Sequence, residues 1–299
     1  MGSFSKIAGG TGAVVVTGGA LALAPVAPSM AAGPRAVRIP CSTAALAAGI
    51  TAANASTGTV LRLTTGCIYD IATPATVATG LPVITGNVTL IGGSKTSIRR
   101  DPAAVTPFRV LDVAAGGTLR VVRLSILNGS TAGLGGGIQN AGTLVLRHAT
   151  LAGNRAGNGG AVANIAGATA TISRSLLTAN STTSVGGGGI INSGTLTTTG
   201  TVVSANTAPI NGGGLNTQSS GTSKLISTTV AHNTSGGLGG GLSNLGTTSL
   251  DRTLVRANRG SSGGGIATGN TNVTLRRSVV RNNIPDNCSP LDTVPGCVG

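Results

Sequence analysis

Gly187-Gly188-Gly189-Ile190 and Val203-Ser204-Ala205-Asn206 are the two parts of a motif that recurs through the second half of this chain. The first part is a run of small residues, mostly glycine, followed by an aliphatic residue, and the second is an aliphatic residue three positions before an asparagine. The asparagines are spaced 25–27 residues apart, and they are Asn154, Asn180, Asn206, Asn233, Asn258 and Asn283. A fixed period of this length is typical of stacked supersecondary units. The motif therefore predicts a solenoid.

Residue types within each repeat favour strands over helices. The stretch 142–151 alternates apolar and polar residues over short runs and is rich in Thr, Val and Leu, which is typical of strand–turn–strand structure. The repeats contain no long glycine-free run with a helical period, which disfavours helical repeats. Coils of about 25 residues with two or three short strands suit a parallel β-helix. We expect roughly nine coils, each adding about 4.8 Å of height.

The two repeated columns have a structural explanation. Glycines at one corner allow positive φ and let the backbone pass close to the neighbouring coil. Stacked asparagines at another corner can hydrogen-bond to the turn backbone and to each other, so we expect a structural ladder rather than a binding site. The aliphatic residue before each asparagine should fill the interior, together with an apolar column formed by Leu146, Ile172, Leu225, Leu250 and Leu275.

The two ends of the chain differ from the repeats. Lys6 precedes a long apolar, glycine-rich run and then small residues suited to cleavage, which is typical of a secretory signal peptide; an uncleaved membrane anchor is the alternative. Ser42 can cap an alanine-rich helix at about 43–53. A solenoid needs both open ends covered. The expected organisation is a signal peptide at 1–32, an N-terminal cap at 33–57, β-helix repeats at 58–283 and a C-terminal cap loop at 284–299.

The four cysteines lie near the two ends of the expected mature chain, in two local pairs. An even number of cysteines in an exported protein indicates disulfides. Pairing by proximity predicts Cys41–Cys67 and Cys288–Cys297. A metal site is the alternative, but no histidine lies near either pair and no C-x-x-C motif occurs. We therefore predict two disulfides and no metal site.

The repeats resemble two groups of β-helix proteins. The glycine-aliphatic and aliphatic-x-x-Asn parts resemble the GGA[ILV] and FxxN repeats of chlamydial polymorphic outer membrane proteins, with Leu or Val here in place of Phe. The stretches 41–46, 80–90 and 286–288, with Gly-Thr-Leu coils between them, resemble the secreted right-handed parallel β-helix proteins of high-GC actinobacteria. This resemblance covers residues 36–299. It implies an all-β, single-stranded right-handed parallel β-helix and export, and it implies no particular activity.

Acidic residues are too few for the usual polysaccharide chemistry. The chain has no glutamate and six aspartates, and 138 consecutive residues between Asp112 and Asp251 contain no carboxylate. Glycoside hydrolysis usually needs two carboxylates about 5–10 Å apart, and a calcium-dependent lyase needs clustered acidic oxygens. We predict no catalytic residue and no cofactor. The alternative is a metal-free polysaccharide lyase, whose candidate residues are Arg99, Arg100, Arg123, Arg147 and His148.

Positive charge is the remaining functional feature. The formal net charge is +14, and several arginines lie six or seven positions before an asparagine of the motif. This interrupted basic stripe predicts contact with an anionic cell-wall or extracellular polysaccharide; a solvated face that keeps the rod in solution is the alternative. Tyr69 and Phe108 are the only aromatic residues after the leader, so nucleic acid is not an expected partner. The stripe consists of Arg123, Arg147, Arg174, Arg252 and Arg277.

Taken together, these features predict an exported, non-catalytic β-helix protein that acts outside the cell or at its surface. We expect an adhesin-like or anionic-polysaccharide-binding rod. It should be a monomer, either released or associated with the cell wall, and it should make no membrane contact once the leader is removed.

Overall fold

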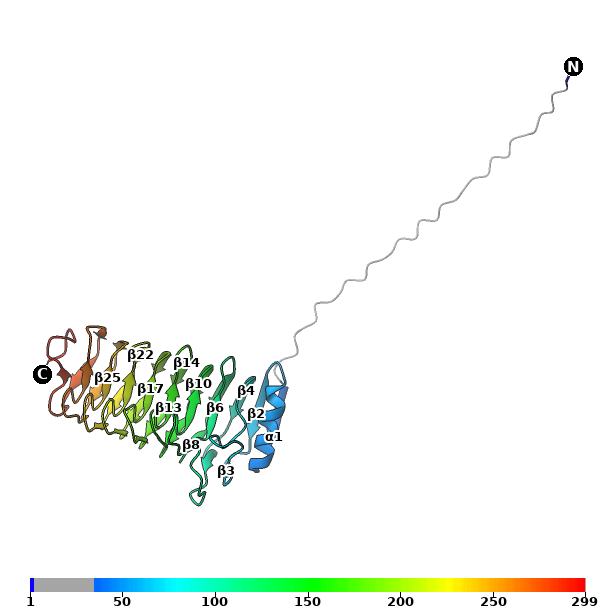
Figure 1. Cartoon of the computed structure of the whole chain (residues 1–299), viewed down its shortest axis with the longest axis horizontal. Coiled ribbons are helices and arrows are strands. Elements are labelled where there is room, and N and C mark those ends of the chain that lie inside the picture. The colour runs from blue at the N-terminus through cyan, green and yellow to red at the C-terminus, as the bar shows by residue number, and fades with distance from the viewer. Residues whose placement is uncertain (3–34, 299) are drawn as a thin grey trace. The chain divides into compact units, whose positions relative to one another are not determined.

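The chain forms a parallel β-helix, as Figure 1 shows in this computed structural model. The structure describes residues 1–2 and 35–298, so the expected leader lies almost wholly outside the described residues. Residues 35–298 form one compact unit. All of its strand pairings are parallel, and its longest sheet has ten strands. This is one more than the roughly nine coils expected from the sequence, because a strand that precedes the helix pairs with the stack.

Four sheets run along the stack. Sheet A contains β1 Arg35–Ile39, β2 Thr59–Leu63, β4 Asn87–Ile91, β7 Thr118–Val122, β10 Thr143–Arg147, β14 Thr169–Ser173, β18 Thr195–Thr199, β22 Thr222–Ile226, β26 Thr247–Asp251 and β29 Val273–Arg276. Sheet B contains β3 Ile68–Ile71, β5 Ser97–Arg100, β8 Ser125–Leu127, β11 Thr150–Ala152, β15 Leu176–Thr178, β19 Val202–Ser204, β23 Thr229–Ala231, β27 Leu254–Arg256 and β30 Val279–Arg281.

The other two sheets are shorter. The third sheet contains β6 Leu111–Val113, β9 Ile138–Asn140, β13 Val162–Asn164, β17 Ile190–Asn192, β21 Leu215–Thr217, β25 Leu242–Asn244, β28 Ile266–Thr268 and β31 Cys288–Ser289. The fourth sheet contains β12 Arg155–Ala156, β16 Ser181–Thr182, β20 Thr207–Ala208 and β24 Thr234–Ser235.

The strands stack in a constant register, so one column of side chains faces the interior and the next faces solvent. Leu146 pairs with Val121 on one side and with Ile172 on the other, and all three are buried. The aliphatic residues before the asparagines are buried as expected, whereas Leu275 in the last strand of sheet A is only partly buried. Alternation along each strand thus produces the interior columns that the sequence predicted.

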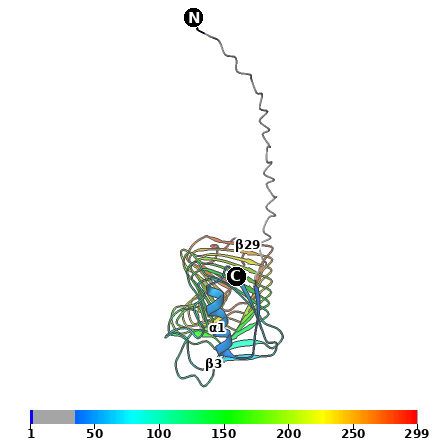
Figure 2. The ribbon, with the colours of Figure 1, turned by 90° about the vertical axis from the view of Figure 1, so that its right-hand side faces the viewer.

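One α-helix covers the N-terminal end of the stack. Helix α1 spans Thr43–Asn54, and the Ser42 side chain accepts a hydrogen bond from the backbone N–H of Ala45, which is an N-cap. Its buried residues are Leu46, Ile50 and Ala53. Figure 2 shows α1 lying across the end of the coils. The predicted helix and its cap are confirmed, and the helix shields the apolar interior of the first coils from water.

Both predicted disulfides are confirmed. Cys41 and Cys67 have Cα atoms 5.6 Å apart and tie the start of α1 to the start of β3. Cys288 and Cys297 have Cα atoms 6.3 Å apart and close a loop at the other end. The buried side chain of Val294 lies within this loop. Strand β31 of the same segment pairs with β28, so the C-terminal segment is anchored both covalently and through the third sheet.

The asparagines of the repeat motif form one buried column. Each of the first five donates from its Nδ2 to the Oδ1 of the asparagine in the next coil, as in Asn180 to Asn206 at 2.9 Å and Asn206 to Asn233 at 3.0 Å. The same Oδ1 also accepts from the backbone N–H of the donating asparagine, as Asn206 Oδ1 does from Asn180, and Asn206 Nδ2 also donates to the backbone carbonyl of Leu177. The amide groups are therefore fully used inside the protein.

A second, shorter asparagine ladder was missed in the sequence. Asn140 donates to the Oδ1 of Asn164 at 2.7 Å, and Asn164 donates to that of Asn192 at 2.8 Å. Each lies two positions after the aliphatic residue of the glycine motif, so the longer pattern glycine–aliphatic–x–Asn would have revealed it. In the next coil Thr217 takes the place of the asparagine, and Asn192 donates instead to Ser223 Oγ of sheet A. This ladder is therefore less regular.

We predict that Asn206→Leu lowers the free energy of unfolding by about 1–3 kcal/mol, because it leaves buried partners in both neighbouring coils without hydrogen bonds. Chemical denaturation measures the loss. Asn272→Leu is the matched control, since Asn272 is exposed and its side chain makes no hydrogen bond among the described residues. Equal stability of the two variants would contradict a structural role for the ladder.

Candidate functional site

The corner between sheets A and B turns through one residue with a left-handed backbone in each of seven successive coils. The φ values at this position lie between 47° and 55°. Main-chain hydrogen bonds continue through the turn; the N–H of Arg123 donates to Arg147 O at 3.0 Å, and that of His148 to Ser173 O at 3.1 Å. Side chains at this position therefore stack in one column. From the N-terminal side, the column contains Arg123, His148, Arg174, Gly200, Ser227, Arg252 and Arg277.

The predicted basic stripe falls on two adjacent columns of this corner, not on one. Arg147 is the last residue of β10 and pairs with Val122 and Ser173, so it lies one position before the turn column. The turn position in its coil belongs to His148. From the sequence, His148 is predicted only as a lyase candidate and not as part of the stripe. Counting six residues back from each asparagine, without allowing seven, would have placed His148 in the column.

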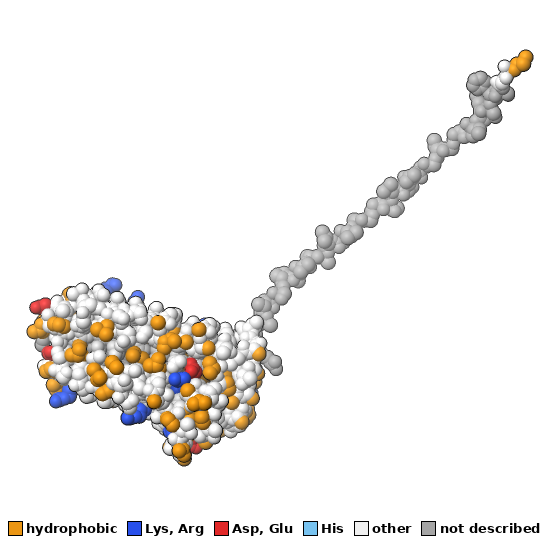
Figure 3. Space-filling view, in the orientation of Figure 1, with side chains coloured by type: hydrophobic (Ala, Val, Ile, Leu, Met, Phe, Trp, Pro, Cys, Tyr) orange, Lys and Arg blue, Asp and Glu red, His pale blue; other side chains and the backbone are white. Residues whose placement is uncertain are grey.

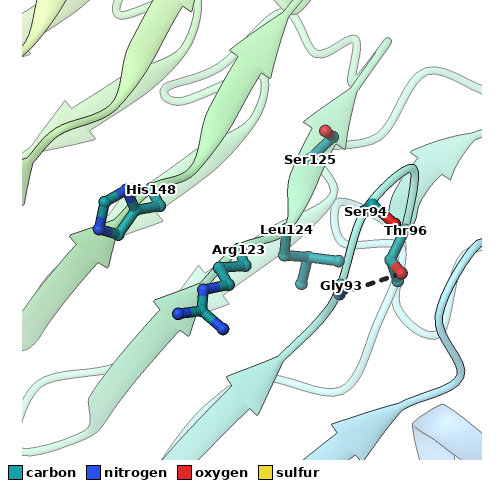
Figure 4. Close-up of a pocket in the computed structure, with 7 residues that line it drawn as sticks. All are labelled: Gly93, Ser94, Thr96, Arg123, Leu124, Ser125 and His148. Carbon is teal, nitrogen blue, oxygen red and sulfur yellow. Dashed lines mark hydrogen bonds between the residues drawn. The ribbon is translucent and has the colours of Figure 1, made fainter.

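Two shallow hollows lie side by side along the turn column. The first has a volume of about 420 Å³ and is lined by Arg123, His148 and Ser125, together with residues of the 92–96 loop. The second also has a volume of about 420 Å³ and is lined by His148, Arg174 and Thr150. Figure 4 shows the Arg123 and His148 side chains on neighbouring coils, extending toward the same side. Because His148 borders both hollows, the two hollows adjoin, and together they are called the groove below.

The charges of the stripe are concentrated at its N-terminal end. In the coils of Gly200 and Ser227 the two columns hold no charged residue. In the next coil Arg252 Nη1 lies 3.0 Å from Asp251 Oδ2, which neutralises this arginine. Arg123, Arg147 and Arg174 are exposed and make no ion pair with any described residue. The groove therefore carries uncompensated positive charge, whereas Arg277 is separated from it.

Two of the five lyase candidates lie away from this corner. Arg99 forms a two-pronged ion pair with Asp70 on sheet B. The hydrogen bonds with Asp70 raise the pKa of Arg99 above its ordinary value, although desolvation opposes the shift; a cation stabilised in this way is a poor general base. Arg100 donates to the carbonyl of Ala104, and its guanidinium carbon lies 5.4 Å from the centre of the Phe108 ring. Arg100 therefore supports the 101–108 loop, whereas Arg99 is held by Asp70.

The remaining charges do not build a second site. Arg109 and Asp112 form a largely buried ion pair, with Nη1 and Oδ2 2.8 Å apart. Figure 3 shows a face in which uncharged side chains dominate and charged ones are scattered. Residues 1–2 and 35–298 contain no group of three or more His, Cys, Asp or Glu side chains that could hold a metal ion. No helix of the described chain is long and apolar enough to cross a membrane.

Comparison with known proteins leaves the groove as the main guide to function. No protein-family model, no curated protein and no solved structure matches the chain. The fold supports the description of a parallel β-helix repeat protein, and any statement about a narrower type or an activity depends on the residues described above.

We predict that Arg174→Gly raises the free energy of unfolding by about 0.5–1 kcal/mol, because glycine removes the left-handed backbone strain at φ 47° and this relief exceeds its added chain entropy. Gly200 already occupies the same position one coil later. Arg147→Gly is the matched control. Because Arg147 lies in an extended strand, this substitution should lower the free energy of unfolding by about 0.5–1 kcal/mol. Thermal unfolding of both variants tests this. Destabilisation by both would show that the Arg174 side chain supports the fold.

Proposed function

We propose that this chain is an exported, non-catalytic β-helix protein that binds an anionic polysaccharide along the corner between sheets A and B. One observation carries the proposal: Arg123, His148 and Arg174 stand in three successive coils along a groove formed by two adjoining hollows. A linear ligand lying parallel to the stack would contact all three coils. The groove is shallow and open, which suits a polymer better than a small molecule enclosed on all sides.

The chemistry of the groove favours ionic recognition. Arginine presents a planar fork of donors that matches a carboxylate or phosphate group. Ser125 and Thr150 line the floor and supply hydroxyl groups that suit sugar hydroxyls. Stacking against sugar rings would need aromatic side chains, but Tyr69 and Phe108 are both buried. Binding should therefore weaken as salt screens the charges.

The setting of the protein belongs to the same proposal. Two disulfides are compatible with an oxidising compartment outside the cytoplasm. With the leader-like sequence of residues 1–32, they support export and a place outside the cell or at its wall. We include in this proposal a monomeric state and the secreted actinobacterial type of β-helix that the sequence resembles.

A metal-free lyase on the same groove is the competing function. The structure brings Arg123, Arg147 and His148 to one corner, and these residues could bind a uronic acid and remove a proton from it. A lyase would release products with a new double bond, detected by their ultraviolet absorbance. Steady release of such products from polygalacturonate would replace the binding proposal with this one.

The binding test uses polygalacturonate as the probe and compares two double variants of equal charge change. Arg123→Gln with Arg174→Gln should weaken binding about tenfold, because two exposed ion pairs of up to about 1 kcal/mol each are lost. Arg155→Gln with Arg259→Gln is the control, since these exposed arginines lie along the fourth sheet. Titration calorimetry at low salt measures both. Equal losses would indicate general charge attraction, and no binding by the unmodified protein would refute the proposal.

A further inference from the structure

Basic residues at this corner continue beyond the groove toward the N-terminus. Arg38 pairs with Arg62, and this column passes through Ile91 and Val122 to Arg147. Arg38 and Arg62 are exposed and make no ion pair with any described residue. With Thr64 and other residues they line a further hollow of about 370 Å³. Neither arginine belongs to the stripe predicted from the sequence, because their coils lack the glycine-aliphatic motif and α1 is inserted between them.

The loop at 92–96 joins this hollow to the groove. It links β4 to β5 with five residues, whereas two residues link β7 to β8 in the next coil. Gly92 borders the hollow of Arg38 and Arg62, and Gly93 and Ser94 border that of Arg123. Thr96 Oγ1 accepts from the N–H groups of Gly66 and Gly93 and fixes the loop. Lys95 is exposed on the loop, with φ 57°.

Six successive coils therefore each place a basic side chain at one corner of the stack. None of the six aspartates offsets this row. Asp70 is paired with Arg99 and Asp112 with Arg109, and Asp251 lies beyond the row. Asp101 follows the C-terminal end of β5, whereas the 92–96 loop precedes its N-terminal end, and the other two lie in the C-terminal segment. In chain order the row consists of Arg38, Arg62, Lys95, Arg123, Arg147 and Arg174.

The spacing of this row specifies the kind of polymer that would fit it. Neighbouring strands lie about 4.8 Å apart, so five steps from the first coil to the sixth span about 24 Å. An extended chain of 1,4-linked pyranose sugars advances by nearly one coil height per sugar. A polyuronic acid, in which every sugar carries a carboxylate, would therefore carry about one negative charge per coil height along the row.

We propose that the row binds about six consecutive sugars of a polyuronic acid that lies parallel to the stack, with the Arg38–Arg62 hollow as an extension of the groove. This inference rests on the proposed function, because it assumes that the groove binds an anionic polysaccharide. It adds the length of the site and the charge pattern of the ligand. Flexible arginine and lysine side chains accommodate small mismatches between sugar and coil spacing.

The test compares oligogalacturonides of about three and about seven sugars, matched to half and to the whole of the row. The longer oligomer should bind at least about tenfold more tightly. Arg38→Gln with Arg62→Gln should remove most of this gain in affinity while leaving the affinity for the short oligomer unchanged. Arg256→Gln with Arg281→Gln, on adjacent coils of sheet B, should change neither. Melting temperatures of both variants establish that the fold is intact.

The outcomes separate this inference from the proposed function. If the longer oligomer binds through Arg123 and Arg174 but is indifferent to Arg38 and Arg62, the extension is wrong and the groove stands. If the protein binds neither oligomer, the proposed function fails as well. A hyaluronan oligomer of equal length, with a carboxylate on every second sugar, should show about half the salt dependence of binding. Equal salt dependence would overturn the assignment of one charge per sugar.

Discussion

The constant register between coils is the constraint on which the rest of this structure depends. Parallel main-chain hydrogen bonds hold each residue over the residue at the same position of the next coil, so a side chain's nearest neighbours lie about one period away in sequence. A residue type repeated at that period becomes a column. Leucine then builds an interior wall, asparagine a hydrogen-bonded ladder and arginine a line of charge.

The asparagine columns show why this register tolerates buried polar groups. A carboxamide has both a donor and an acceptor, so a stacked series can pass hydrogen bonds from coil to coil without leaving an unused atom in the middle. Amide groups lack a partner within the column only at its two ends. There Asn283 donates to Asn287 of the C-terminal segment, and Asn154 Oδ1 accepts from the backbone N–H of Gly129 in the preceding coil. Capping therefore concerns polar columns as well as the apolar interior.

Sequence periodicity predicted the features that repeat, and it failed where the register depends on structure outside the repeat. The stacked strands, the cap at Ser42 and both disulfides followed from local patterns. Arg252 is neutralised by Asp251, and Arg147 lies one position before the turn column. Both facts depend on which strand position faces which corner. Arg38 and Arg62 belong to coils of irregular length, and only pairing between β1 and β2 aligns them.

A comparison of two left-handed corners of the stack gives the strongest argument that the arginines are not required by the fold. At the second corner, between sheet B and the asparagine ladder, φ lies between 52° and 65°, and the residues are three alanines, two asparagines, one glycine and His232. Both corners need a residue with a left-handed backbone. For a residue other than glycine, this conformation costs about 1–2 kcal/mol relative to the right-handed conformation. Small residues are therefore sufficient at such a turn. The arginines between sheets A and B add long charged side chains that, at Arg123 and Arg174, have no acidic partner among residues 35–298. Their presence is consistent with the proposed ligand outside the chain, since no ion pair within the described residues accounts for Arg123 or Arg174.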